Sequence, residues 1–276
     1  MPVEARRLIR KMRGGAQAHL IEGSDGNAYV VKFLNNPQHR RILANEWIAS
    51  AFLHYLGIST PEVAVVEITS EFLEENPETY TQLASKRISP DLGWHFGSRF
   101  PGDINRTVVY DFLPDTLLSR VENLAELVGT LAFDKWMGNA DSRQAIFFRA
   151  RVSGLGPASA PGHLGFIAQM IDNGYIFEGP HWRFSESAIQ GLYHRQAIYE
   201  KVSGLIAFEP WLERIRHFPE EVVDRALHTM PRSWIEGDEE TLERLLQQLL
   251  RRRARVADLI GDCRTARNNP FPAWKK

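Results

Sequence analysis

The feature that most constrains this chain is a pair of short apolar segments, each with acidic residues at one end. The first is the apolar run 145–148, at the end of FDKWMGNADSRQAIFF (residues 133–148), and the polar turn 138–144 precedes it. The second lies in FIAQMIDNGYIF, residues 166–177, and ends in Asp-Asn-Gly at 172–174. Each apolar segment predicts a strand, and two such strands can form a hairpin. A hairpin would bring the acids of the turn and Asp172 to one edge.

Paired carboxylates beside an amide suit a divalent metal that carries phosphates, because Mg²⁺ prefers hard oxygen ligands. That arrangement is the core of a phosphotransfer site, where the protein mainly positions groups and neutralises charge. The alternative is that these acids are turn residues that only cap the strands. The two interpretations stay open on these residues alone.

Composition limits the class of protein. The 276 residues are 43% hydrophobic and 24% charged, which suits one large domain or two lobes. The formal net charge of −1 offers no general attraction to nucleic acid or to an anionic membrane. The single cysteine, Cys263, excludes an intrachain disulfide and a cysteine-based zinc site and fits a reducing cytosol. Since we find neither a signal peptide nor an apolar run of roughly 18 residues, we expect a cytoplasmic protein without a membrane span.

The N-terminal part reads as a three-stranded meander over residues 5–12, 18–22 and 28–33. Its first turn contains Gly14, Gly15 and Gln17. Glycines there could let backbone N–H groups approach a phosphate. The alternative is an ordinary hairpin turn.

Lys32 lies inside the apolar third strand, in VVKF. Such a lysine can extend to solvent from an edge strand, or it can point into a cleft at phosphates. In the cleft it needs a carboxylate partner to stay charged. The helical periodicity over 40–57 supplies one in Glu46, although a solvated glutamate is the alternative.

The segment GWHFGSR, residues 93–99, predicts a connection between two lobes. Trp94 or Phe96 could stack on a nucleotide base, or either ring could pack in the core. We place the boundary near 97–102, which divides the chain into an N-lobe of residues 1–98 and a C-lobe of residues 99–276.

In the C-lobe we expect helices over 117–138, 189–208, 219–228 and 239–261, and a flexible loop over 151–163. The last helix carries RRRAR at 251–255, which could bind nucleic acid or form a solvated face. The near-neutral net charge favours the solvated face.

In order and spacing these features resemble the protein-kinase fold: VVKF resembles the lysine strand, Glu46 the helix glutamate and Asp172-Asn173-Gly174 the metal-binding motif. More narrowly, four segments between residues 7 and 177 together resemble the HipA-like kinases: KFLNNPQHRRILANEWIASAFLHYLGI, GWHFGSRF, FDKWMGNADSRQAIFF and MIDNGYIF.

The resemblance implies an α+β, two-lobed kinase-like fold that binds ATP between a small strand-rich N-lobe and a larger helical C-lobe. It implies Mg²⁺-assisted phosphoryl transfer in which Lys32 holds the phosphates, Glu46 holds Lys32 and Asp172 binds metal. An acid of the turn would orient the acceptor hydroxyl.

The sequence also departs from the kinase pattern. It has no His-Arg-Asp, and Ile146 stands where an asparagine usually follows the catalytic aspartate. Gln144, or after it Asn139, would have to replace that amide at the metal.

Two acids compete for the catalytic position. Asp134 has the kinase spacing to Asn139 but lies in a helical apolar pattern, where it could brace the loop. Asp141 lies in the turn, and its separation from Asp172 suits a tight hairpin once the loop 151–163 is removed. We therefore predict Asp141 as the catalytic acid.

The resulting prediction is an ATP- and Mg²⁺-dependent phosphotransferase acting on a hydroxyl, either Ser/Thr of a protein or a small molecule. A pseudokinase or scaffold that binds nucleotide without phosphoryl transfer is the alternative, and nucleic-acid binding ranks third. The segments characteristic of toxin-type HipA proteins are not recognisable, so toxin action is not implied. The acceptor and the oligomeric state are not predicted.

Overall fold

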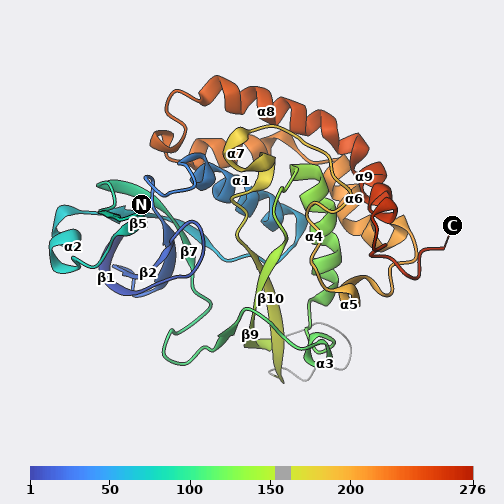
Figure 1. The fold of residues 1–276 in the computed structure, drawn as a ribbon, viewed down its shortest axis with the longest axis horizontal. Helices are drawn as coiled ribbons and strands as arrows, with labels where there is room; N and C mark the ends of the chain where they lie inside the picture. The colour runs from blue at the N-terminus through green and yellow to red at the C-terminus, as the bar shows by residue number, and fades with distance from the viewer. Residues whose placement is uncertain (153–162, 276) are drawn as a thin grey trace.

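The structure, a computed structural model, describes residues 1–152 and 163–275 and has a strand-rich N-terminal part and a larger, mainly helical C-terminal part (Figure 1). Five strands form a closed barrel in the order β1-β2-β3-β7-β4. They are β1 Val3–Lys11, β2 His19–Gly23, β3 Ala28–Lys32, β7 Gly93–Arg99 and β4 Val63–Ile68. A parallel pair between β1 and β4 closes the barrel. The α+β, two-part architecture predicted from the sequence is confirmed.

Apolar side chains fill the barrel, and one glycine permits its close packing. The buried residues of this cluster are Ala5, Ile21, Tyr29, Val31, Phe33, Val66, Ile68 and Phe72. A Cβ atom on Gly97 of β7 would lie 2.5 Å from Cγ2 of Val66 on β4, so a larger residue would push these strands apart. Helix α2, Ser70–Glu75, and the hairpin of β5, Thr81–Leu83, and β6, Lys86–Ile88, lie between β4 and β7 in sequence.

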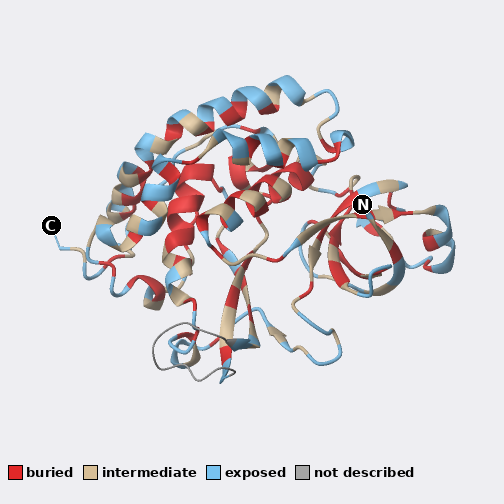
Figure 2. Ribbon diagram, turned by 180° about the vertical axis from the view of Figure 1, so that it is seen from behind, coloured by how far each residue is buried: buried red, intermediate tan, exposed pale blue. Residues whose placement is uncertain are grey.

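Helix α1, Arg41–Leu56, belongs to the N-terminal half of the sequence but packs among the C-terminal helices, where its buried face is visible in Figure 2. It contacts α6 Glu209–Arg216, α7 Glu220–Thr229 and the 3-10 helix η1 Ile176–His181. The helix ends at Gly57, whose φ of 71° is the left-handed conformation typical of a C-terminal cap. Glu46 therefore sits on an element held by both parts of the molecule. The division at residues 98 and 99 stays a prediction.

The predicted hairpin is confirmed. Strand β9, Gln144–Val152, pairs antiparallel with β10, His163–Ile171, and the register places Gln144 opposite Ile171. The short strand β8, Val109–Tyr110, completes a three-stranded sheet in the order β10-β9-β8. Both long strands extend beyond the predicted apolar segments. Most of the predicted loop 151–163 lies outside the described residues.

The other C-terminal elements are α3 Asp115–Leu118, α4 Leu124–Met137, α5 Gln196–Tyr199, η2 Leu205–Phe208, η3 Arg232–Trp234, α8 Glu239–Arg252, η4 Arg253–Arg255, α9 Val256–Asp262 and η5 Cys263–Thr265. A continuous helix over 189–208 was wrong. Gly191 has a φ of 72° and Arg195 is extended, so the helix cannot continue through either residue. Within residues 1–152 and 163–275, no helix is both long and apolar enough to span a membrane.

The predicted helix over 239–261 is interrupted by the 3-10 turn η4, and three of the arginines at 251–255 make contacts within the molecule. Arg252, only 9% exposed, donates to the Lys135 carbonyl and to Glu186. Arg253 donates to the Phe218 carbonyl, and Arg255 pairs with Glu186. These contacts join α8 and η4 to α4 and to the turn that follows α6, and they oppose the interpretation of 251–255 as a nucleic-acid patch.

Candidate active site

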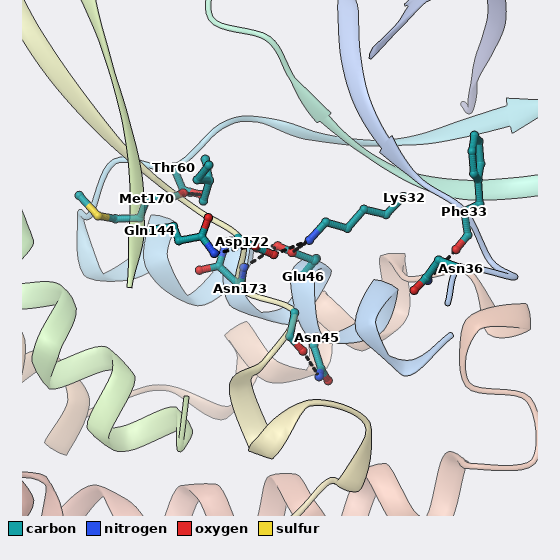
Figure 3. A network of polar contacts seen from close by, with 12 residues as sticks. Lys32, Phe33, Asn36, Asn45, Glu46, Thr60, Gln144, Met170, Asp172 and Asn173 are labelled. Atoms are coloured by element: carbon teal, nitrogen blue, oxygen red, sulfur yellow. Dashed lines mark hydrogen bonds and ion pairs between the residues drawn. The ribbon is translucent and has the colours of Figure 1, made fainter. Parts of the chain in front are cut away.

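Lys32, at the end of β3, reaches between two carboxylates (Figure 3). Its Nζ lies 2.5 Å from Oε1 of Glu46 on α1 and 2.7 Å from Oδ1 of Asp172, which follows β10. The Lys32 side chain is 10% exposed and the Glu46 side chain 4% exposed. The fold thus brings together three of the predicted site residues from a strand, a helix and a strand end.

The electrostatics of this cluster keep Lys32 and Asp172 charged. Burial by itself would lower the pKa of Lys32, but the carboxylates of Glu46 and Asp172 outweigh burial, and the pKa is raised. Burial would raise the pKa of Asp172, but Lys32, Arg143 and the amide of Gln144 lower it. Lys32 therefore stays a cation and Asp172 an anion at neutral pH.

The backbone at 172–174 explains the Asp-Asn-Gly sequence. Asp172 has a φ of 57°, a left-handed conformation in which aspartate is among the few tolerated non-glycine residues. A Cβ on Gly174 would lie 2.5 Å from Cγ2 of Ile42, so only glycine lets this turn pack against α1.

Asn173 is a contributor that the sequence reasoning missed. Its backbone N–H donates to Oε2 of Glu46 at 3.1 Å, and its Oδ1 accepts from Nη1 of Arg143 at 2.7 Å. It links the helix glutamate to the polar turn before β9. The only sequence signal for it was its place in the Asp-Asn-Gly motif.

The polar side chains of the turn before β9 lie in three different environments: Gln144 contacts Asp172, Asp141 is exposed and Asn139 is buried. Nε2 of Gln144 donates to Oδ2 of Asp172 at 2.9 Å, so Gln144 lies beside the predicted metal ligand. Asp141 is exposed, and its Oδ1 accepts from the Ser142 N–H. Asn139 is buried, with its Nδ2 on Asp134 and its Oδ1 accepting from the Asp141 N–H. The Asn139 amide thus shapes the turn.

Asp134 is fully buried on α4 and pairs with Arg143. Nε of Arg143 donates to Oδ2 of Asp134 at 2.9 Å, and Nη1 of Arg143 also reaches the Ile171 carbonyl. Asp134 therefore braces the turn from within the core. Arg143 is a second residue that the sequence reasoning missed, because no periodicity marks a buried arginine in a polar turn.

A cavity of about 580 Å³ opens over this cluster between the barrel and the β9–β10 hairpin. Lys32, Glu46, Gln144, Asp172 and Asn173 line one side of it. Gly14, Gly15 and Gln17 of the β1–β2 turn line another. Its apolar lining includes the predicted Phe96, together with residues that the sequence reasoning did not assign: Val30, Val63, Val109, Ile146 and Met170. Asp141 is not among the lining residues.

Gln17 lines the cavity but has its amide engaged by the protein, and Trp94 lies outside the cavity. The amide of Gln17 exchanges two hydrogen bonds with the Gln82 backbone, which anchors the glycine turn to the β5–β6 hairpin. Trp94 is 45% exposed and is not among the cavity-lining residues, whereas Phe96, two positions later on β7, is buried and lines it. Residues two apart in a strand share a face, so the two rings differ in their position along β7: Trp94 lies near its exposed start and Phe96 further in.

The model of the family described as HipA-like kinase matches residues 5–146. The chain belongs to the HipA-like kinase family. In this HipA-like kinase the matched segment contains Lys32, Glu46 and Asp141 and ends before Asp172. No curated protein matches the chain.

Two solved structures resemble this HipA-like kinase over 96% of its chain and 73% of theirs. One is the Golgi casein kinase with Mn/ADP bound, at 12% identity and a TM-score of 0.48. The other is a crystal structure of the Golgi casein kinase, at 14% identity and a TM-score of 0.49.

The donor atoms in the cavity fit a metal held jointly with phosphates. Asp172 offers carboxylate oxygens beside the amide of Gln144. In the described parts of this HipA-like kinase no three His, Cys, Asp or Glu side chains form a cluster that could hold a metal alone. Mg²⁺ commonly binds through one or two carboxylates, water and substrate phosphates, so this set is sufficient only with nucleotide present.

Proposed function

We propose that this chain binds ATP and Mg²⁺ in the cavity and transfers a phosphoryl group to a hydroxyl, either Ser/Thr of a protein or a small molecule. The observation that carries the proposal is the buried Lys32 between Glu46 and Asp172, within hydrogen-bonding distance of both carboxylates. A lysine fixed in this way presents a positive charge where phosphates would lie. Membership of the HipA-like kinase family supports the same activity.

We assign a separate role to each polar residue of the cavity. Lys32 would contact the phosphates, and Glu46 would hold Lys32. Asp172, with the Gln144 amide oxygen, would ligate Mg²⁺, which when bound neutralises charge on the phosphates. In the β1–β2 turn, Gly14 and Gly15 would bring backbone N–H groups near the phosphates. Asn139 has its amide engaged with Asp134, so it ranks behind Gln144.

The apolar side of the cavity suits a nucleotide base. The base would pack against aliphatic and aromatic side chains there, namely Val30, Ile146, Met170 and Phe96. Ile146 here occupies the position of the missing kinase asparagine. Trp94 would not contact the base.

Asp141 would orient the acceptor hydroxyl. It lies in the turn that Asn139, Asp134 and Arg143 hold rigidly, and its exposure leaves it open to an incoming acceptor. A carboxylate in this role accepts or orients the hydroxyl proton during transfer. The single cysteine also supports a reducing compartment such as the cytosol.

The test is incubation of the purified chain with Mg²⁺ and γ-labelled ATP, with release of ADP and labelling of the protein as readouts. We expect turnover that EDTA abolishes. A second function, nucleotide binding without transfer, is favoured by Ile146, which removes one metal-facing amide. Thermal stabilisation by ATP and Mg²⁺ without any ADP release would support this alternative.

A further inference from the structure

Asn45, the neighbour of Glu46 on α1, is fully buried and has every polar atom of its side chain engaged. Its Nδ2 donates to the carbonyls of Gly174, Gly179 and Ile176 at 2.7, 3.0 and 3.2 Å. Its Oδ1 accepts from Nε1 of Trp182 at 2.8 Å. One side-chain amide thus makes four hydrogen bonds to the segment 174–182, three to backbone carbonyls and one to an indole N–H.

The segment that Asn45 contacts is unusually strained. Four of the seven non-glycine residues with positive φ in the described chain lie between 172 and 182: Asp172, Phe177, Glu178 and Trp182. Such conformations persist only where the surroundings hold them in place. The amide of Asn45 is the buried polar group that bonds this backbone at three points.

The same segment also supports the turn that carries Asp141. The Ala140 N–H donates to the Tyr175 carbonyl, and the Glu178 N–H donates to the Gly138 carbonyl. A shift of 174–179 would therefore move both Asp172 and the polar turn.

We propose that Asn45 is a positioning residue that holds the Asp172 carboxylate in the cavity by fixing the backbone that follows it. This inference rests on the proposed function. Glu46 and Asn45 lie on one helix that is itself packed into the C-terminal core, so the lysine partner and the metal ligand are fixed by the same element (Figure 3).

The test uses Asn45→Asp in the full chain. The substitution keeps the acceptor for Trp182 but turns a carboxylate toward three carbonyl oxygens. We expect the Mg²⁺ concentration that half-saturates ATP binding to rise about 10–100-fold, as for other groups that orient a metal ligand. ATP affinity in EDTA should not change. Hydrogen exchange at the amides of residues 176, 178 and 179 should become faster.

Asn36→Asp is the matched control. Asn36 is also a buried asparagine, with Nδ2 on the carbonyls of Phe33 and His39 and Oδ1 accepting from the Gln38 N–H, but it contacts no part of 172–182. It should leave the Mg²⁺ dependence and the exchange of 176–179 unchanged. If Asn45→Asp does not fold, Trp182→Phe removes the indole donor alone and should shift both readouts in the same direction by a smaller factor.

The outcomes separate this inference from the proposed function. Unchanged Mg²⁺ dependence in a folded Asn45 variant overturns the inference even if exchange is faster, because Asn45 would then serve stability only. If the unaltered chain shows no Mg²⁺-dependent ATP binding, the proposed function fails. Exchange then tests the part of the inference that does not depend on metal, which is that Asn45 fixes the backbone of 174–179: faster exchange confined to this segment supports that part and unchanged exchange overturns it.

Discussion

Asp134 and Arg143 form an ion pair from which water is excluded, with side-chain exposures of 0% and 1%. The pair joins the end of α4 to the turn before β9. Arg143 carries the connection on to Asn173 and the Ile171 carbonyl, at the end of β10. The carboxylate with the kinase spacing to Asn139 is thus part of the core, and the exposed carboxylate of the turn is Asp141.

The two acids should therefore respond differently to the same substitution. Asp134→Asn removes the charge that partners a buried guanidinium, and we expect it to lower the free energy of unfolding by about 3–5 kcal/mol. Asp141→Asn should leave stability and ATP affinity nearly unchanged and cut turnover by about 10²–10⁴-fold. Urea unfolding and steady-state kinetics on both variants measure these effects. Loss of turnover in a stable Asp134 variant, with an active Asp141 variant, would reverse the assignment.

Lys32→Met tests the nucleotide site. The substitution removes the cation that bridges Glu46 and Asp172 and should cut turnover by about 10²–10³-fold, the cost of losing one group that stabilises developing charge. It should also remove the thermal stabilisation given by ATP and Mg²⁺. Glu46→Gln should act in the same direction but less strongly, because Glu46 supports Lys32. Circular dichroism checks the fold, and a normal ATP response in Lys32→Met would exclude Lys32 from the site.

Asp172→Asn tests the metal site. Asparagine tolerates the left-handed backbone of this position and keeps the side-chain size, so the change is mainly one of charge. We expect the Mg²⁺-dependent part of ATP binding to disappear, measured by calorimetry with and without EDTA. If Asp172 only caps the turn, the variant will lose some stability but its ATP binding will respond to Mg²⁺ as before.

His95 on β7 should make stability depend on pH. Burial lowers its pKa from 6.5 to about 4. Its Nδ1 accepts from the Leu34 N–H and its Nε2 donates to the Asp91 carbonyl, so a second proton would break the first bond. The unfolded state binds a proton first as pH falls, so stability is full above about pH 6.5 and declines until about pH 4. The loss can reach about 3 kcal/mol.

Urea unfolding at pH 7, 5.5 and 4.5 measures this decline. His95→Asn should flatten it, although His19, whose pKa burial also lowers to about 4, will retain a similar contribution. The exposed His228 is the control, and His228→Asn should follow the unaltered chain. An equally steep decline in His95→Asn would show that His95 does not titrate as the structure indicates.

The sequence by itself determined which elements exist and which residues carry chemistry along them. A run of β-branched and aromatic residues predicts β3, and helical periodicity predicts α1, because both patterns follow from local backbone preferences. The sequence was also enough to select Lys32, Glu46 and Asp172 as candidates. A lysine inside an apolar strand and an Asp-Asn-Gly at a strand end are unusual local patterns, and Glu46 lies on the helix that follows the lysine strand. Local patterns failed over 189–208, where Gly191 fits closely against Asp134, a contact from a distant part of the chain.

Only the tertiary structure decided how these residues meet. Lys32 and Asp172 lie 140 positions apart and are joined by a 2.7 Å contact that no pattern encodes. Arg143, Asn173 and Asn45 became visible as part of the site only through their partners. Each has a polar side chain in the interior, and whether burial is tolerated depends on partners brought from other elements. The sequence shows that such a residue is present, but only the folded chain shows which charged group or carbonyl it contacts and therefore what it does.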